Sequence, residues 1–266
     1  MTIASPQNQA PALVQVVRRE AIVEIALANG SLNLVTRAML RHLNQVVCGL
    51  AGEHDTRCVI LHGGDARAFC AGSDIGEFEQ IRHDASEQKI LFEDMVLRNL
   101  ARLPMPTIAA IDGPALGGGF ELALCCDLRV VRRGVSIGLP ECHHGGLAGN
   151  GAVRVTRLVG PSRAKQMLFT GEQVDAQRAR DWGLVNFVAD DTSALELARN
   201  VADTISARGP LSNRLAKELV AQSQDEPVDA GLLRSTVAQQ RIFDSDDLQE
   251  GAAAFFQKRA PIFSGR

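Results

Sequence analysis

The chain has 266 residues, 45% of them hydrophobic and 22% charged, a composition typical of a globular protein with one sizeable core. Its formal net charge of −3 argues against a nucleic-acid binder that relies on bulk positive charge, but it does not exclude a local basic site for a phosphate-bearing ligand. The six cysteines lie mostly in apolar runs and lack zinc-ligand spacing. This pattern indicates a reducing compartment rather than a disulfide framework.

The N-terminal segment lacks the basic region and apolar stretch of a signal peptide, and it lacks the Arg-rich pattern of a transit peptide. We interpret residues 1–11 as a short disordered lead. No apolar run in the sequence is long enough to span a bilayer. These features favour a cytoplasmic protein without a membrane partner.

The first part of the chain alternates strand and helix patterns. Residues 12–28 alternate and are rich in Val and Ile, which predicts a β-hairpin, and helical spacing over 35–50 predicts a helix with Thr36 as its N-cap. Apolar runs and an amphipathic pattern predict the next elements, which are buried strands at 57–63, 106–113 and 127–131 and a helix at 85–103. Strands that alternate with helices indicate α/β architecture.

The strand signals stop after about residue 195, and helical periodicity continues. Three segments carry it: 193–208, 211–224 and 232–245. We therefore predict an α/β core over residues 12–195 and a helical C-terminal module over residues 196–266. Helices with unpaired apolar faces often pack on another subunit, so we expect this module to serve oligomerisation.

Two loops of small residues follow two of the predicted strands. One is HGGDARAFCAGSDIGEF at 62–78, where Asp74 can cap the next helix, and the other is DGPALGGGFE at 112–121. If the loops converge, the N–H groups near Ser73 and of Gly118 would donate to one oxygen, which is the geometry of an oxyanion hole. Tight helix–strand packing is the alternative explanation for three consecutive glycines.

Two glutamates are candidates for acid/base chemistry. Glu121 lies in an otherwise apolar helix, where a buried carboxylate calls for a reason beyond the favourable helix dipole. Glu141 follows Pro140, a dipeptide that is also typical of an ordinary turn. Two carboxyl groups on either side of one site could hold a water, one taking its proton while the other protonates the opposite carbon.

His143 and His144 are rival candidates for the chemistry near Glu141. Adjacent residues on a regular backbone do not both face one point, and no third ligand is spaced to join them. We therefore expect no metal site.

The segments AFCAGSDIGEF and PTIAAIDGPALGGGFELALCCDLRV together resemble the two signature loops of the enoyl-CoA hydratase/isomerase (crotonase) superfamily. Residues 161–188 and 250–263 resemble later segments of the same family, so the likeness covers nearly the whole chain from about residue 12. The resemblance implies an α/β fold, a ClpP-like spiral of ββα units with a helical C-terminal trimerisation module. It also implies homotrimers, often stacked into hexamers.

The resemblance further implies an acyl-CoA thioester whose carbonyl oxygen is held by the N–H groups of Ser73 and Gly118, with Glu121 and Glu141 as the catalytic pair. Phe255 and Lys258 match positions that meet the CoA moiety near a subunit boundary. The implied substrate-binding residues are Ala71, Ser73, Asp74, Ile75, Gly76, Gly117, Gly118, Phe255 and Lys258.

The reaction that the resemblance implies is the addition of water across the 2,3 double bond of a trans-2-enoyl-CoA, as in fatty acid metabolism, without a metal or redox cofactor. The alternatives are a double-bond isomerase or another enolate-forming enzyme, and a non-catalytic member that binds acyl-CoA or RNA. The net acidity and the two glutamates speak against the last. The segment 142–155 departs from the usual hydratase pattern, with Ala148 where proline is common, and this segment shapes the acyl site.

Overall fold

A computed structural model describes residues 12–266, so the disordered lead predicted for residues 1–11 lies outside the described residues. The strands are β1 (Val14–Arg19), β2 (Ile22–Leu27), β3 (Cys58–His62), β4 (Thr107–Ile111), β5 (Ala115–Leu116), β6 (Leu128–Arg132), β7 (Ser136–Gly138), β8 (Gln173–Asp175) and β9 (Phe187–Ala189). The helices are α1 (Arg37–Ala51), α2 (Phe78–Ile81), α3 (Leu91–Ala101), α4 (Gly118–Leu124), α5 (Gly149–Thr170), α6 (Ala176–Asp181), α7 (Ala194–Ser206), α8 (Pro210–Ser223), α9 (Val228–Phe243) and α10 (Asp246–Gln257). Shorter helical turns lie at Ile75–Glu77, Ser86–Ile90 and Glu141–His144.

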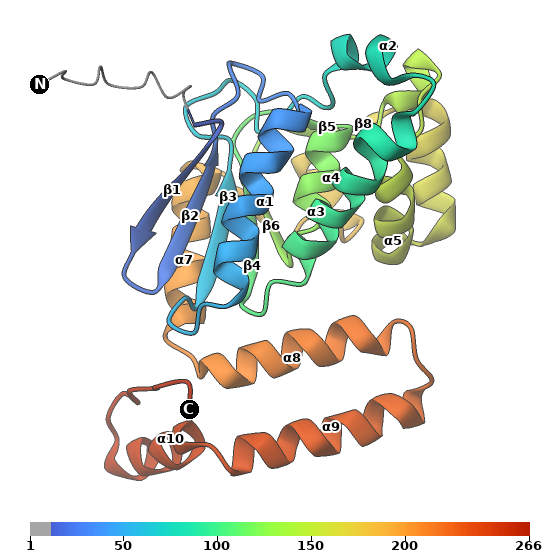
Figure 1. Cartoon of the computed structure of the whole chain (residues 1–266). Coiled ribbons are helices and arrows are strands. Elements are labelled where there is room, and N and C mark those ends of the chain that lie inside the picture. Colours follow the sequence, from blue (N-terminus) through green and yellow to red (C-terminus); the bar gives the residue numbers. More distant parts are fainter. Residues whose placement is uncertain (1–11) are drawn as a thin grey trace, which may run out of the picture.

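The larger sheet has six strands in the order β1-β2-β3-β4-β6-β9. The predicted hairpin is confirmed, because β1 and β2 pair antiparallel, and the later strands join in parallel. Thr36 caps α1 as predicted, since its Oγ1 accepts a hydrogen bond from the Met39 N–H at 3.1 Å. Helices α1 and α3 cover one face of this sheet and α7 covers the other (Figure 1). Burial on both faces explains why these strands read as continuous apolar runs.

Helix α7 belongs with the sheet rather than with the helices that follow it. Its residues Ala194, Ala198 and Ala202 pack in one buried cluster with Cys58 and Ile60 of β3. The boundary predicted at residues 195/196 therefore falls inside a helix of the core, and the helices outside the sheet layers begin with α8. The small alanine side chains allow α7 to pack closely against the strands.

A smaller sheet, β5-β7-β8, holds the start of α4. Its short strands were not predicted, because runs of two or three residues carry little periodicity. The Gly117 N–H donates to the Gly138 carbonyl at 2.9 Å, which extends the β5–β7 pairing to the residue just before α4.

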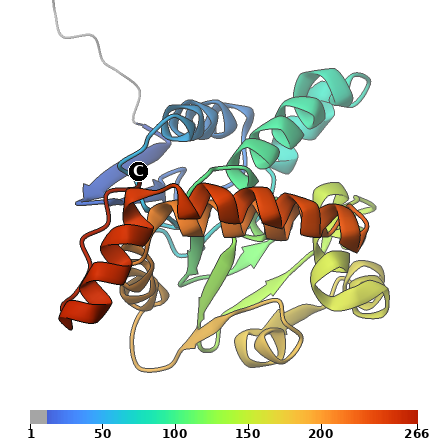
Figure 2. The ribbon, with the colours of Figure 1, turned by 90° about the horizontal axis from the view of Figure 1, so that it is seen from below.

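Helices α8 and α9 form an antiparallel pair beside the core, and α10 follows at its end (Figure 1); the view from below shows the long α9 crossing under the core (Figure 2). Among the described residues, none of the helices combines the length and apolar character that a membrane span requires.

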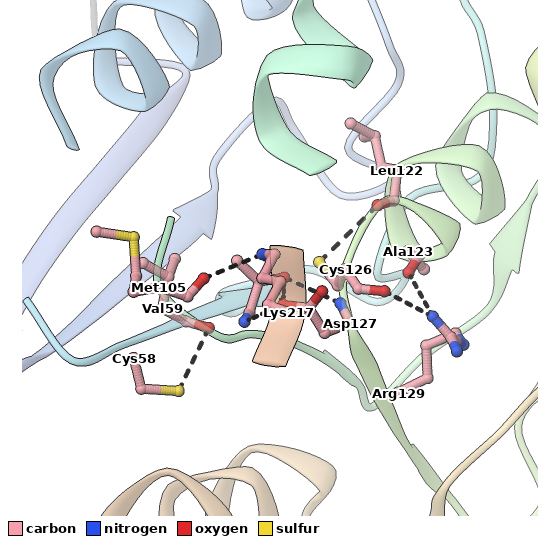
Figure 3. Close-up of polar contacts among 10 residues, drawn as sticks. Cys58, Val59, Met105, Leu122, Ala123, Cys126, Asp127, Arg129 and Lys217 are labelled. Carbon is pink, nitrogen blue, oxygen red and sulfur yellow. Dashed lines mark hydrogen bonds and ion pairs between the residues drawn. The ribbon is translucent and has the colours of Figure 1, made fainter. Parts of the chain in front are cut away.

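Lys217 fastens α8 to the core at the amino-terminal ends of two strands (Figure 3). Its Nζ lies 2.7 Å from Asp127 Oδ2 and donates to the Met105 carbonyl at 3.0 Å. The same carboxylate oxygen accepts from the N–H and the hydroxyl of Thr107, at 2.8 and 2.9 Å. Asp127 follows α4 and Thr107 begins β4, so one ammonium group joins α8 to both.

We expect Lys217→Met to lower the free energy of unfolding by about 1–2 kcal/mol, because it leaves Asp127 without its cation in a partly buried position. For a chain of this size the change corresponds to a fall in Tm of about 2–8 °C. Thermal unfolding monitored by circular dichroism measures it. Lys165→Met, at an exposed position of α5, is the control and should leave Tm unchanged. Equal Tm values for the two variants would contradict this account of the attachment.

Candidate active site

The start of α4 is built on a backbone conformation that suits glycine. Gly117 precedes the helix with φ of 53° and ψ of −130°, a region that L side chains rarely adopt. Its carbonyl accepts the Glu121 N–H at 2.9 Å, which starts the helix. The N–H groups of Gly118 and Gly119 fall in the first turn, where an α-helix supplies no acceptor.

Gly118 and Gly119 touch the loop that follows β3. A Cβ on Gly119 would lie 2.1 Å from the Cys70 carbonyl oxygen, so only glycine fits there. A Cβ on Gly118 would lie 3.0 Å from Ser73 Oγ and 3.6 Å from Ser73 N. The packing explanation therefore holds for Gly119, while Gly118 faces the Ser73 amide that the sequence analysis paired with it.

Ser73 is held by strand-like pairing with Val35, which turns its amide away from that partner. The Val35 N–H donates to the Gly72 carbonyl at 2.8 Å, and the Asp74 N–H donates to the Val35 carbonyl at 3.1 Å. In this parallel pattern Ser73 lies between the two residues that bond to Val35, and its own N–H points away from Val35. Within residues 12–266, no backbone hydrogen bond from the Ser73 N–H is found.

The other residues expected in this loop have separate roles. The Ala71 N–H donates to the Leu32 carbonyl at 2.9 Å and fixes the loop. Asp74 caps the turn Ile75–Glu77 as predicted, since its Oδ1 accepts from the Gly76 N–H at 2.9 Å. Ile75 presents an exposed apolar side chain.

Glu121 lies buried one turn into α4. Its side chain is held at its Oε1, which accepts the Gly151 N–H at 2.6 Å. Burial raises the pKa of the Glu121 carboxyl above its usual value, the Gly151 N–H lowers it, and the charge of Glu141 raises it again. A carboxyl group with these neighbours keeps its proton to a higher pH than a carboxyl in water.

Glu141, in the turn that follows β7, approaches the same end of α4. A Cβ on Gly117 would lie 2.9 Å from Glu141 Oε1, so the carboxyl group rests against the residue before the helix. Glu141 Oε2 is buried and has no hydrogen-bond partner among the described residues. Burial also raises the pKa of this carboxyl. An unpaired buried carboxyl oxygen is free to exchange a proton with a bound molecule.

His143 lies against the far end of α5 rather than against the carboxyl pair. His143 Nε2 lies 3.0 Å from the Thr170 carbonyl oxygen, at the other end of α5, and both His143 and His144 are exposed. In the part of the chain that the structure describes, no group of three or more His, Cys, Asp and Glu side chains is arranged to hold a metal ion.

The residues that hold Glu121 were not predicted from the sequence. A Cβ on Gly151 would lie 2.8 Å from Leu139 Cδ2 and 3.2 Å from Glu121 Oε1, so glycine allows this close approach. The neighbouring Asn150 is fixed by Asp94 of α3, whose Oδ1 accepts from the Asn150 side chain at 3.2 Å. The Gly-Asn-Gly run at 149–151, at the start of a helix, was the available signal.

Phe255 and Lys258 do not join this group within one chain. Phe255 lies in α10 and Lys258 ends that helix with a left-handed backbone, φ 54°. Helix α10 lies near α8, at the end of the molecule where the amino-terminal ends of β4 and β6 lie (Figure 1). The loops of Ser73 and Gly118 lie at the other end of the sheet, because they follow the carboxyl ends of β3 and β4.

The chain is similar to known proteins in both sequence and structure. The family model for enoyl-CoA hydratase/isomerase matches residues 17–266. An enoyl-CoA isomerase/hydratase of Mycosarcoma maydis is 36% identical over 88% of this chain and 89% of its own length. A short-chain-enoyl-CoA hydratase of Clostridium acetobutylicum is 30% identical over 92% and 95%. The crystal structure of an enoyl-CoA hydratase from Bacillus anthracis superposes with a TM-score of 0.89 at 35% identity, covering 96% of this chain and 100% of that one.

The match of the family model spans nearly the whole chain, and the likeness in structure extends over the same length. The chain therefore has the α/β crotonase fold and belongs to the enoyl-CoA hydratase/isomerase family.

Proposed function

We propose that this protein is an enoyl-CoA hydratase that adds water across the 2,3 double bond of a trans-2-enoyl-CoA to give a 3-hydroxyacyl-CoA. The observation that carries the proposal is a pair of carboxyl groups at the start of α4 beside the Ser73 and Gly118 amides: Glu121 is buried, and Glu141 is half-buried with a buried Oε2. An isomerase needs one group to move a proton between two carbons, whereas hydration uses an acid and a base on a water. A carboxyl pair favours hydration.

The amides of Ser73 and Gly118 bind the thioester carbonyl oxygen in this mechanism. When a nucleophile adds at C3, negative charge develops on that oxygen, and two fixed N–H dipoles stabilise the enolate. One such donor is worth about 3–4 kcal/mol in the transition state. The positive end of the α4 dipole adds to the same field at Gly118.

The two carboxyl groups divide the proton transfers. Glu121, oriented by the Gly151 N–H, takes a proton from the water as its oxygen bonds to C3. Glu141, whose Oε2 is buried without a protein partner, delivers a proton to C2 of the enolate. The raised pKa of Glu141 suits a group that must hold a proton before the reaction. No metal or redox cofactor enters the proposed reaction, and a cytoplasmic location stays a prediction.

Conversion of either carboxyl group to an amide tests the mechanism. We expect Glu121→Gln and Glu141→Gln each to lower kcat for crotonyl-CoA hydration by about 100- to 10,000-fold, because an amide neither accepts nor donates the proton in question. Loss of absorbance of the conjugated thioester measures the rate. Glu20→Gln, at an exposed turn between β1 and β2, is the matched control and should keep the wild-type rate.

Wild-type rates in both active-site variants would contradict the mechanism. Conversion of a 3-enoyl-CoA into a 2-enoyl-CoA without hydration would assign the isomerase reaction instead. Tight binding of acyl-CoA without turnover would assign a non-catalytic role.

We further propose that the protein assembles as a homotrimer or a pair of trimers. Helices α9 and α10 expose many large apolar side chains, a pattern typical of a surface that a second copy covers. These side chains are Val228, Leu232, Leu233, Val237, Phe243, Phe255 and Phe256. In such an assembly, Phe255 and Lys258 would meet the CoA moiety bound by a neighbouring subunit, which agrees with their distance from the Ser73 loop of their own chain.

Sedimentation equilibrium tests the assembly. We expect three or six times the chain mass, and we expect Leu233→Glu together with Val237→Glu to reduce it, since buried charges oppose association. A wild-type protein that sediments as a monomer at micromolar concentration would contradict the proposal.

A further inference from the structure

The buried Lys89 and the half-buried Glu93 form a pair of opposite charges that the proposed mechanism does not use. Lys89 lies in the π-helical turn Ser86–Ile90, which runs directly into α3, and only 4% of its side chain is exposed. Glu93 follows four residues later in the first turn of α3, with 16% of its side chain exposed. Single π-helical turns are frequent at functional sites.

The two charged groups approach each other without a hydrogen bond. Lys89 Nζ lies 4.0 Å from Glu93 Oε2, beyond hydrogen-bond range. The ammonium also lies 5.0 Å from the centre of the Phe78 ring, a contact that favours a cation but accepts no hydrogen bond of ordinary strength. Lys89 Nζ and the Glu93 oxygens are not among the fully buried atoms that lack a partner within residues 12–266, so a bound molecule can reach them.

The pair belongs to the same part of the structure as the carboxyl groups of the candidate active site. Asp94, the residue after Glu93, binds the side chain of Asn150 at 3.2 Å, and the next residue, Gly151, binds Glu121 at 2.6 Å. Burial raises the pKa of Glu93, the ammonium of Lys89 lowers it, and the charge of Glu121 raises it further, which is consistent with this proximity. The first turn of α3 therefore lies close to Glu121, the residue beside which C3 would lie in the proposed function.

We propose that Lys89 and Glu93 together bind a hydroxyl group on the acyl chain of the substrate, at a position beyond C3; this inference rests on the proposed function. A hydroxyl oxygen accepts a hydrogen bond from Lys89 Nζ, and its proton is donated to a Glu93 carboxylate oxygen. One neutral group thus forms a hydrogen bond with each of the two charged groups.

Other acyl groups form fewer favourable contacts with Lys89 and Glu93. An alkyl end leaves both charges without a hydrogen bond. A carboxylate end can accept from Lys89, but it places a second negative charge against Glu93 in a region that already holds Glu121. The geometry therefore favours an alcohol or a phenol over a hydrocarbon or a dicarboxylic acyl group.

Binding of saturated acyl-CoA esters to the assembled wild-type protein tests the inference without turnover. Isothermal titration would compare esters of four to eight carbons that end in a methyl, a hydroxyl or a carboxylate. We expect the hydroxyl ester to bind at least about tenfold more tightly than the methyl ester for at least one chain length, since a site built for a hydroxyl rejects the analogue that lacks it.

Lys89→Met should abolish this preference by weakening the hydroxyl ester alone, and Lys165→Met, an exposed lysine of α5, should preserve it. Glu93→Gln keeps the shape of the side chain and should reduce the preference. Glu93→Gln replaces Lys89→Met in the experiment if Lys89→Met does not fold.

Equal affinities for methyl and hydroxyl esters at every length would overturn the inference. Equal losses of affinity for both esters in Lys89→Met, or a preference of the wild-type protein for the carboxylate ester, would also overturn it. Any of these results in a protein that still hydrates crotonyl-CoA would leave the proposed function intact. A wild-type protein that binds none of the esters would overturn both.

Discussion

Cys70 packs so closely against the first turn of α4 that its carbonyl oxygen would lie 2.1 Å from any Cβ at position 119. This contact brings the chain after β3 onto the first turn of a helix that begins 48 residues after Cys70. The Leu116 N–H strengthens it by donating to the same carbonyl at 3.0 Å. Because Ser73 lies three residues after Cys70 in that segment, its amide lies near Gly118, and the two donors are held by the packing of the core rather than by flexible side chains.

The carboxyl groups depend on the same end of α4. Glu121 projects from the helix into a buried region where the Gly151 N–H orients it, and Glu141 rests against Gly117 from the turn after β7. Burial raises the pKa of both, so the elements that build the site also set the acidity of its groups. The outlying pair of Lys89 and Glu93 lies along α3, next to the residue that fixes Asn150. The residues that orient Glu121 and the proposed hydroxyl-binding pair thus lie in one part of the fold.

Much of this arrangement could be predicted from the sequence, because local sequence patterns determine it. The hairpin, the buried strands and the Thr36 cap follow from periodicity and capping chemistry. The short strands β5, β7 and β8 could not be predicted, since two or three residues pair only when distant segments meet. The same holds for the contacts of Glu121 with Gly151 and of Lys217 with Asp127, which join residues far apart in the chain. Helix α7 was assigned to the wrong module because an alanine-rich helix on a sheet has the same spacing as one outside it.

The central claim is that two main-chain amides grip one thioester oxygen. A crystal structure of the protein with a non-reactive acyl-CoA, such as acetoacetyl-CoA, measures it directly. The account predicts the thioester oxygen within about 2.7–3.1 Å of both the Ser73 and the Gly118 nitrogen atoms. A thioester oxygen that contacts neither amide, in a complex with the CoA moiety fully ordered, would contradict it.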